Sequence, residues 1–426
     1  MGLLAGPARR GGLRRGDGEG VDWLRRRPAS ARKTFRSLGR VGGGARMDTS
    51  RLVETEPLPE IRAVGVLRCL GLVALGLLTL GWVARGIGSV LPPTAQTDAE
   101  RKLAAFFAED EGYDTLFLGT SLVHRGIDPL VFDAAMTRFG VPTRSFNAAL
   151  PAMDAFEQEV VLRRILERRP EGLVNVLVAP DMIAANLSAE HLRNRRTALW
   201  HETSTTLHVS SALLQRNAPW PATLTQLYRH WQAWWLRGTN GGEVRERLDA
   251  WMRPVDPDEA RLALLGPDGR GFVALDQLVS EVSPELVEEQ LAFRAQFLGQ
   301  EEEFTHRVAA FAKRPMPTGP PHAAGSAYLA RLTRMAKEAG VRLVVFLLPG
   351  GTVEDRDWLL RARALDEDRH WIDLTSPSAF PELYAVHHRF DRFHVNADGA
   401  VRMTELLAER FASLLSEGEA SRRGPR

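Results

Sequence analysis

Cysteine is almost absent from this chain of 426 residues, and Cys69 is the only one. A single thiol excludes a disulfide framework within the chain and any metal site built from several cysteines. An excess of charge is also lacking, because 55 Lys and Arg residues oppose 53 Asp and Glu residues and leave a formal net charge of +2. This balance gives no reason to expect a nucleic-acid partner. The remaining composition, 44% hydrophobic and 25% charged, is that of a globular protein.

Residues 1–62 form a basic leader in which arginine and glycine are frequent and aliphatic residues are sparse, above all in 1–46. Such a segment cannot bury enough apolar surface to offset the entropy of ordering it, so we expect it to be disordered. Aromatic residues that could stack on bases are nearly absent from it. Two interpretations stay open: a cytoplasmic leader, or an upstream extension of the reading frame with Met47 as the true start.

A long apolar segment runs from Val64 to Ala84, and Arg68 is its only charged residue. At about 1.5 Å per residue this length matches a hydrocarbon core about 30 Å thick, so the sequence predicts a transmembrane helix within 63–91. Trp82 stands where an interfacial aromatic residue is common. A buried core helix would show a polar face, and a cleaved signal peptide would be shorter and followed by an A-x-A-like site.

The orientation of this segment depends on the leader. Positive charges close to the two ends of the apolar segment are nearly balanced, with Arg62 and Arg68 opposed by Arg85, Arg101 and Lys102. The arginines of the leader favour a cytoplasmic N-terminus. We therefore expect a single-pass protein in the cell membrane, whose C-terminal domain faces the extracytoplasmic side.

Residues 98–426 show apolar runs that alternate with amphipathic segments. Strands are predicted at 114–119, 141–147, 172–180, 341–349 and 370–374. Helices are predicted at 128–140, 154–169, 326–340, 354–365 and 397–418. This alternation is typical of βαβ units. The fold class expected is therefore α/β: a three-layer α/β/α arrangement around a parallel sheet, of the flavodoxin-like type.

The alternation is interrupted at about 187–322 by an insertion whose pattern is mostly helical. The insertion is rich in tryptophan, with Trp200, Trp220, Trp231, Trp234, Trp235 and Trp251. Such a stripe is most often core packing. A lid, a partner surface and a contact with the membrane surface remain alternatives.

Ser121 is the first residue with a chemical interpretation. It follows Gly119 and Thr120 at the end of the first predicted strand, and ligands of open α/β sheets bind beyond the carboxyl ends of the strands. The glycine allows a close turn of the backbone. Ser121 could instead only cap the helix that follows.

Asp391 and His394 form the second element, between the last predicted strand and the last helix. A serine needs a base to remove its proton, and a histidine base needs a carboxylate to fix its tautomer. Two alternatives are a polar turn that caps the helix and a metal cluster that includes His387 and His388. Four ligands within eight residues would crowd one loop, so we expect no metal.

An early G-x-S after a strand and a late D-x-x-H before the final helix resemble the layout of SGNH/GDSL esterases and acyltransferases. The blocks FLGTSLVHRGIDP (117–129) and FDRFHVNADGA (390–400) are similar to those of membrane-anchored SGNH-like proteins, such as the D-alanyl transfer protein of teichoic acid synthesis. The resemblance covers about 100–186 and 325–416. It implies a catalytic set of Ser121, Asp391 and His394.

This chain departs from the pattern of that family at three places. Thr120 replaces the aspartate of Gly-Asp-Ser, and alanines replace the second-block glycine in FNAALPA (146–152). The third block normally contributes an asparagine to the oxyanion hole, and the candidates here are Asn147 and Asn186. Oxyanion stabilisation is often the largest catalytic term, so these departures bear on activity more than on fold.

The resemblance implies a serine esterase or O-acyltransferase without a cofactor, acting on acylated cell-envelope glycans outside the cytoplasm. An alternative is a non-catalytic accessory protein of the same fold that assists a multi-pass membrane acyltransferase. A dinucleotide binder would also fit the sheet, but no G-x-G-x-x-G follows the first strand.

Overall fold

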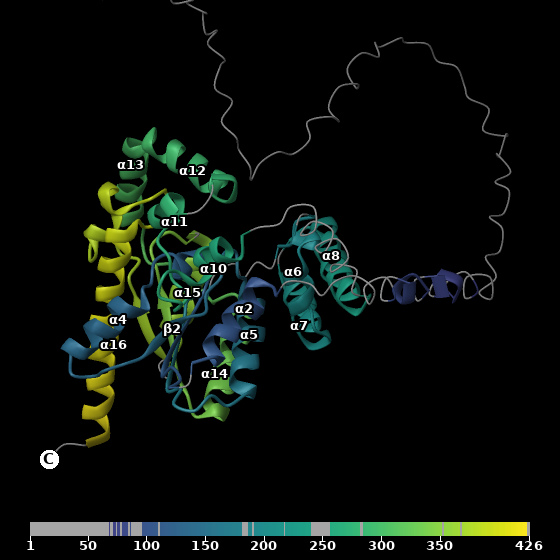
Figure 1. Ribbon diagram of the computed structural model, residues 1–426, viewed down its shortest axis with the longest axis horizontal. Helices are drawn as coiled ribbons and strands as arrows, with labels where there is room; N and C mark the ends of the chain where they lie inside the picture. Colours follow the sequence, from purple (N-terminus) through teal and green to yellow (C-terminus); the bar gives the residue numbers. More distant parts are fainter. Residues whose placement is uncertain are drawn as a thin grey trace, which may run out of the picture. The chain divides into compact units, whose positions relative to one another are not determined.

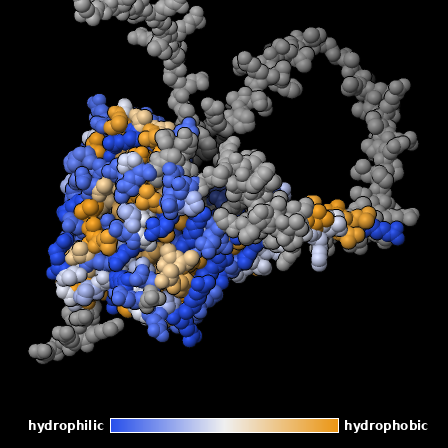
Figure 2. Space-filling view, viewed as in Figure 1, coloured by the Kyte–Doolittle hydropathy of each residue, from blue (hydrophilic) through white to orange (hydrophobic). Residues whose placement is uncertain are grey.

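The computed structural model describes residues 96–423 except 110, 181–185, 190, 217, 240–255, 282–283, 352 and 367–368, together with scattered residues between 68 and 86. The predicted leader 1–62 and much of the predicted transmembrane segment lie outside these residues. Those described between 71 and 83 are helical, and Leu72, Leu80 and Trp82 are exposed. Figure 2 shows orange, hydrophobic atoms beside pale ones in this segment. Among the described residues, no helix has both the length and the apolar character needed to cross a bilayer.

The protein is an α/β protein with a parallel sheet. In the described residues the sheet has five strands in the order β2-β1-β3-β4-β5, and every pairing is parallel. The strands are β1 (Thr115–Leu118), β2 (Ser145–Asn147), β3 (Asn175–Val178), β4 (Arg342–Leu347) and β5 (His370–Asp373). The predicted α/β alternation is confirmed, although β2 is shorter than the predicted strand 141–147. Val141 and Pro142 are not in the ladder, and proline has no N–H to donate to one.

Helices cover both faces of the sheet, and alternate residues of each strand belong to different cores. Leu116 and Leu118 pack with one face, whereas Phe117 packs with the other. The first face is covered by α2 (Asp98–Phe107), α5 (Ala155–Glu167), α14 (Ala323–Ala339) and α15 (Val353–Ala364). The second is covered by α3 (Ser121–His124), α4 (Pro129–Arg138) and α16 (Ala397–Arg423), and Figure 1 shows α4 beside α16. Because both faces are buried, the central residues of β1, β3 and β4 are apolar, and polar residues stand mainly at strand ends.

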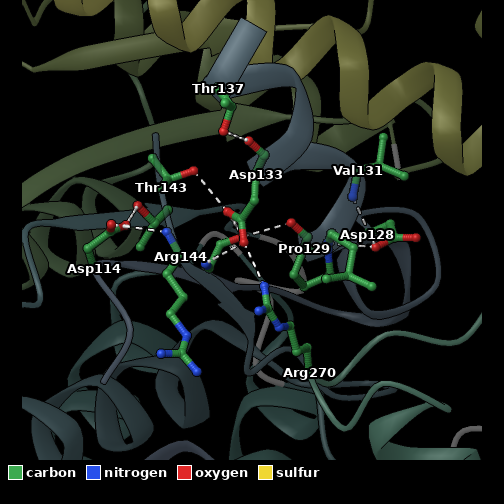
Figure 3. Close-up of polar contacts among 12 residues, drawn as sticks. Asp114, Asp128, Pro129, Val131, Asp133, Thr137, Thr143, Arg144 and Arg270 are labelled. Atoms are coloured by element: carbon green, nitrogen blue, oxygen red, sulfur yellow. Dashed lines mark hydrogen bonds and ion pairs between the residues drawn. The ribbon is translucent and has the colours of Figure 1, made fainter. Parts of the chain in front are cut away.

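The edge strand β2 is anchored through Asp133 of α4 (Figure 3). The carboxylate of Asp133 accepts hydrogen bonds from the Thr143 hydroxyl at 2.8 Å and from the Ser145 amide at 3.0 Å, and it pairs with Arg270 at 2.7 Å. The carbonyl of Arg270 in turn accepts the amide of Asn147 at 2.9 Å. A segment of the insertion therefore lies along β2 and occupies an edge that would otherwise expose unpaired backbone groups.

The insertion is helical, as predicted, and its helices form two groups (Figure 1). The first comprises η1 (His191–Arg193), α6 (Arg195–Trp200), α7 (Thr203–Leu214) and α8 (Trp220–Thr239). It shares a small core with Phe156 and Val160 of α5. The second comprises α10 (Pro257–Leu265), α11 (Leu275–Glu281), α12 (Pro284–Leu298) and α13 (Glu301–Ala312). Its members α11 and α12 pack on Phe390, next to the D-x-x-H turn. Two short helices, η2 (Pro381–Tyr384) and η3 (Val386–His388), precede that turn.

The tryptophans of the insertion do not all pack in a core. Trp200 is buried, but Trp220 is 66% exposed and Trp231 is 39% exposed. Trp234 donates its ring N–H to the Thr203 hydroxyl at 3.1 Å. Core packing thus explains only part of this stripe, and Trp251 lies outside the described residues.

Candidate active site

Ser121 lies at the carboxyl end of β1, as the first residue of α3. Thr120 is the N-cap, and its hydroxyl accepts the Leu122 amide at 3.4 Å, so the capping role falls to Thr120 rather than to Ser121. Gly119 makes the turn possible, because a Cβ there would meet Cγ2 of Val123 at 2.3 Å and its Cβ at 2.9 Å. The turn leaves the Ser121 hydroxyl free of the capping bond, and it is half-buried.

The D-x-x-H turn is organised around the carboxylate of Asp391, which is buried. Its Oδ1 accepts the backbone amides of Phe393 at 2.6 Å and His394 at 2.7 Å. Its Oδ2 accepts Nδ1–H of His394 at 2.9 Å. Burial alone would raise the pKa of Asp391, but the hydrogen bonds from the His394 ring and the two amides outweigh burial and lower this pKa. Asp391 is therefore an ionised acceptor that fixes one tautomer of His394.

The opposite ring nitrogen of His394 reaches Ser121. Nε2 of His394 lies 2.8 Å from Oγ of Ser121, across a sequence separation of 273 residues. With Nδ1–H donated to Asp391, Nε2 is the nitrogen that can accept the serine proton. The structure thus brings together the three residues predicted from sequence, within the spacing that a nucleophile, a base and an orienting carboxylate require.

Two arginines hold the backbone of this turn. Nη2 of Arg389, which is buried, donates to the carbonyl of Arg392 at 3.1 Å. Burial lowers the pKa of Arg389 to about 10, against the opposing effect of Asp391. Nη1 of Arg294, from α12, donates to the carbonyls of Arg389 at 2.8 Å and Phe390 at 2.7 Å. The insertion therefore contributes directly to the position of Asp391 and His394, which sequence patterns could not show.

The loop after β4 packs against the same turn. Gly350 has φ +111°, and a Cβ at this position would lie 2.1 Å from the carbonyl oxygen of Phe393. Only glycine allows both that backbone conformation and that approach. Gly350 thus sets the distance between the β4 loop and the residue directly before His394.

Asn147 is not an oxyanion donor, contrary to the prediction. Its side-chain amide donates to the carbonyls of Val123 at 2.8 Å and Ile127 at 2.8 Å, and its Oδ1 accepts the Ala149 amide at 3.1 Å. The side chain is fully buried. Both donor hydrogens are therefore used in joining β2 to α3 and to the turn after it, and none is left for a substrate.

Asn186 is exposed, and its Oδ1 accepts Nη1 of Arg216 at 3.0 Å. No described contact joins it to Ser121 or His394, and residues 181–185 before it lie outside the described residues. The backbone amide of Ser121 is at the first position of α3, where helix N–H groups have no acceptor within the helix.

Lys102 of α2 is buried under the loop that follows β2. Its Nζ donates to the carbonyls of Asn147 at 2.8 Å, Ala149 at 2.6 Å and Gly271 at 2.8 Å, and it lies 3.0 Å from Nδ1 of His124. Burial, and then the charge of Arg125, lower the pKa of Lys102 well below its usual range. Lys102 ties α2, the β2 loop and the insertion together. Its spacing in the helix gives no sequence signal for this role.

The histidines before the turn are separate from the site. Nδ1–H of His388 donates to the carbonyl of Glu382 at 2.8 Å, and the rings of His387 and His388 pack edge to face. Within the part of the chain that the structure describes, no three histidine, cysteine or acidic side chains are grouped as metal ligands would be.

Comparison with family models, curated proteins and solved structures finds no match to this chain. The interpretation of the site therefore depends on its geometry and chemistry.

Proposed function

We propose that the chain is a serine esterase or O-acyltransferase with an SGNH-like fold. The observation that supports this most directly is the contact series from Ser121 Oγ through the His394 ring to Asp391, at 2.8 and 2.9 Å. It lies at the carboxyl edge of a parallel sheet, where α/β proteins bind ligands. The order of the elements, with an early strand–serine turn and a late Asp-x-x-His, supports the family assignment.

The proposed reaction is acyl transfer in two steps. Nε2 of His394 takes the proton of Ser121, whose Oγ attacks an ester carbonyl, and the alcohol leaves with that proton. Water or a sugar hydroxyl then attacks the acyl-enzyme, gives its proton to His394 and receives the acyl group. The bond between the acyl carbon and Oγ breaks, and His394 returns the proton to Ser121. Asp391 stabilises the imidazolium in both steps. The amide of Ser121 is the proposed oxyanion donor, and no metal or cofactor takes part.

The substrate and location are also proposals. The apolar segment Val64–Ala84 and the basic leader support a single-pass anchor in the cell membrane with the domain on the extracytoplasmic side. Acylated cell-envelope glycans are accessible to a domain in that position. The lipid bilayer and a multi-pass membrane acyltransferase are the partners proposed.

The test is covalent labelling of the full-length protein in detergent by a serine-directed fluorophosphonate. Labelling should map to Ser121 by peptide mass spectrometry and should disappear in Ser121→Ala. Ser204, which lies on α7, provides the matched control variant Ser204→Ala, in which labelling should persist. A folded wild-type protein that is not labelled at Ser121 would contradict the proposal.

A second candidate function is a non-catalytic accessory protein, and the engagement of Asn147 favours it, because one expected oxyanion donor is missing. The two candidate functions predict different effects of substitutions on the ester content of glycans in cells. Esterase or transferase activity predicts that glycan ester content changes in Ser121→Ala, whereas the accessory function predicts no change there. It predicts instead a change when Trp234 and Trp235 of α8 are both replaced by alanine.

A further inference from the structure

An open pocket of about 420 Å³ lies beside the candidate nucleophile. Its lining includes Thr120 and Leu122 on either side of Ser121, and Phe393 directly before His394. Residues that follow the carboxyl ends of β1, β3, β4 and β5 all contribute to it. A carbonyl carbon held at Oγ of Ser121 would therefore have one of its substituents directed into this pocket.

The walls of the pocket are mainly aliphatic and aromatic. One wall is α13 of the insertion, which presents one side chain per turn at Phe304, Val308 and Phe311. The facing wall comes from the α/β domain, with Leu122, Leu348, Val353 and Leu359 among its members. Apolar side chains at this density favour a hydrocarbon occupant, because burial of apolar surface is favourable in proportion to its area.

Three of the polar side chains in the lining are engaged in hydrogen bonds within the protein. The hydroxyl of Tyr384 donates to the carbonyl of Thr375 at 2.7 Å, and the hydroxyl of Thr375 donates to Asp373 at 2.6 Å. Nε of Arg356 donates to that same Thr375 hydroxyl at 3.0 Å, and its guanidinium lies 4.5 Å from the centre of the Phe311 ring. A sugar in the pocket would need partners for several hydroxyls, and the hydroxyls of Tyr384 and Thr375 are already committed as donors within the protein. The charged lining residues Arg307, Asp355 and Arg392 leave the apolar walls as the larger part of the surface.

A pocket of this size is within the range of small-molecule sites, whereas an acetyl group would fill only a small part of it. An acetyl ester would leave most of the pocket unfilled and would gain no binding energy from that space. A longer acyl chain would bury each additional methylene there and bind more tightly. The apolar wall on α13 comes from the insertion rather than from the α/β repeat. The insertion therefore provides a surface for which an acetyl-specific site would have no use.

Resting on the function proposed above, we infer that this pocket holds the acyl chain of the ester, and that the acyl group is a linear hydrocarbon chain of several carbons rather than acetyl. The alcohol portion of the ester then lies on the open side of Ser121. The same pocket holds the chain in the acyl-enzyme while water or a hydroxyl attacks.

The experiment compares 4-nitrophenyl esters from acetate to decanoate with the full-length protein at one fixed detergent concentration. We expect kcat/KM to rise about four-fold for each added methylene, which is about 0.8 kcal/mol, until the chain exceeds the pocket. Val308→Trp should reduce the ratio of octanoate to acetate turnover by about ten-fold or more, since the indole would occupy space worth several methylenes.

Ala309→Trp is the matched control, because Ala309 is the next residue of α13, is exposed and is not in the lining. Ala309→Trp should leave the dependence of kcat/KM on chain length unchanged. Because detergent affects the longer esters equally in both variants, a difference between Val308→Trp and Ala309→Trp comes from the pocket. If Val308→Trp does not fold, Gly351→Leu replaces it. Gly351 is in the lining, and a Cβ there would meet only Leu122, at 3.9 Å.

The outcomes separate the two proposals. Turnover that depends on Ser121 but is flat or falling with chain length, or that is unaffected by the filling variants, would overturn this inference alone. Absence of any turnover and of fluorophosphonate labelling at Ser121 would overturn the proposed function and this inference with it. A rising profile that the filling variants shorten would support both.

Discussion

Replacing Asp391 by asparagine tests the site most sharply, because the two carboxylate oxygens have different tasks. Oδ1 accepts two backbone amides, at 2.6 and 2.7 Å, while Oδ2 accepts the ring N–H of His394 at 2.9 Å. An asparagine has one acceptor oxygen, and the two amides require it. Its NH₂ group must then face Nδ1 of His394, which can accept that hydrogen bond only if the ring proton moves to Nε2.

The expected loss follows from that change of tautomer. A protonated Nε2 would donate to Oγ of Ser121 across the 2.8 Å contact and could not take the serine proton. The precedent for such a change is a rate loss of about 10⁴, equivalent to about 5.5 kcal/mol in the barrier. Stability should change far less, by about 1 kcal/mol, because the two amides keep their acceptor.

The assay is the second-order rate of fluorophosphonate labelling at Ser121, together with the thermal unfolding midpoint of the same preparation. Asp398→Asn is the control, because Asp398 is exposed in the first turn of α16. This substitution removes the same charge from the same segment of the chain. Its labelling rate should equal that of the wild type. If folded Asp391→Asn were labelled within about three-fold of the wild-type rate, the assignment of His394 as the base would be wrong.

Three further predictions concern other parts of the chain. Gly350→Ala should slow labelling of Ser121 markedly, because its Cβ would displace the carbonyl of Phe393; an unchanged rate would contradict the packing argument. Asp154→Asn should raise stability by at most about 4 kcal/mol above pH 7. Burial and then Glu157 raise the pKa of Asp154 from 3.8 to about 7. Wild-type stability therefore falls as the pH rises across that interval. Asparagine has no such charge and can still cap the helix by accepting the Glu157 amide. Urea titrations should show a clearly larger difference at pH 8 than at pH 5, because most of the interval lies above pH 5. The full-length protein should remain with membranes after carbonate extraction, owing to Val64–Ala84, and recovery in the soluble fraction would refute the anchor.

The strands of the sheet could be predicted because burial on two faces leaves a clear pattern. VRLVVFLLP contains β4, and all but the first of its strand residues are buried. Ser121 and His394 could be predicted as partners because each follows a strand and precedes a helix, and parallel strands bring their carboxyl ends to one edge. The 2.8 Å contact between Ser121 and His394 depends on tertiary structure, but a parallel sheet of this topology already places both residues at the same edge.

The supporting residues could not be predicted, because their roles depend on contacts distant in sequence. Asn147 was a reasonable oxyanion donor by residue type, yet the carbonyls of Val123 and Ile127 engage its amide. Arg294 looks like any helix arginine until α12 is seen to place it on the backbone of the D-x-x-H turn. Lys102 gives no sign of burial in an amphipathic helix that begins with a capping box.

The division of the insertion into two groups of helices relates structure to the two candidate functions. The α12–α13 group reaches the site, through Arg294 on the turn and Val308 in the pocket, so its disruption should affect catalysis and acyl-chain preference. The α6–α8 group packs on α5 instead and exposes Trp220, so it is the surface available to an accessory role. An esterase should therefore be sensitive to changes in α12 and α13 and tolerant of surface changes in α6–α8. An accessory protein should show the reverse, which is why Val308→Trp and the double replacement of Trp234 and Trp235 are informative when compared in the same cells.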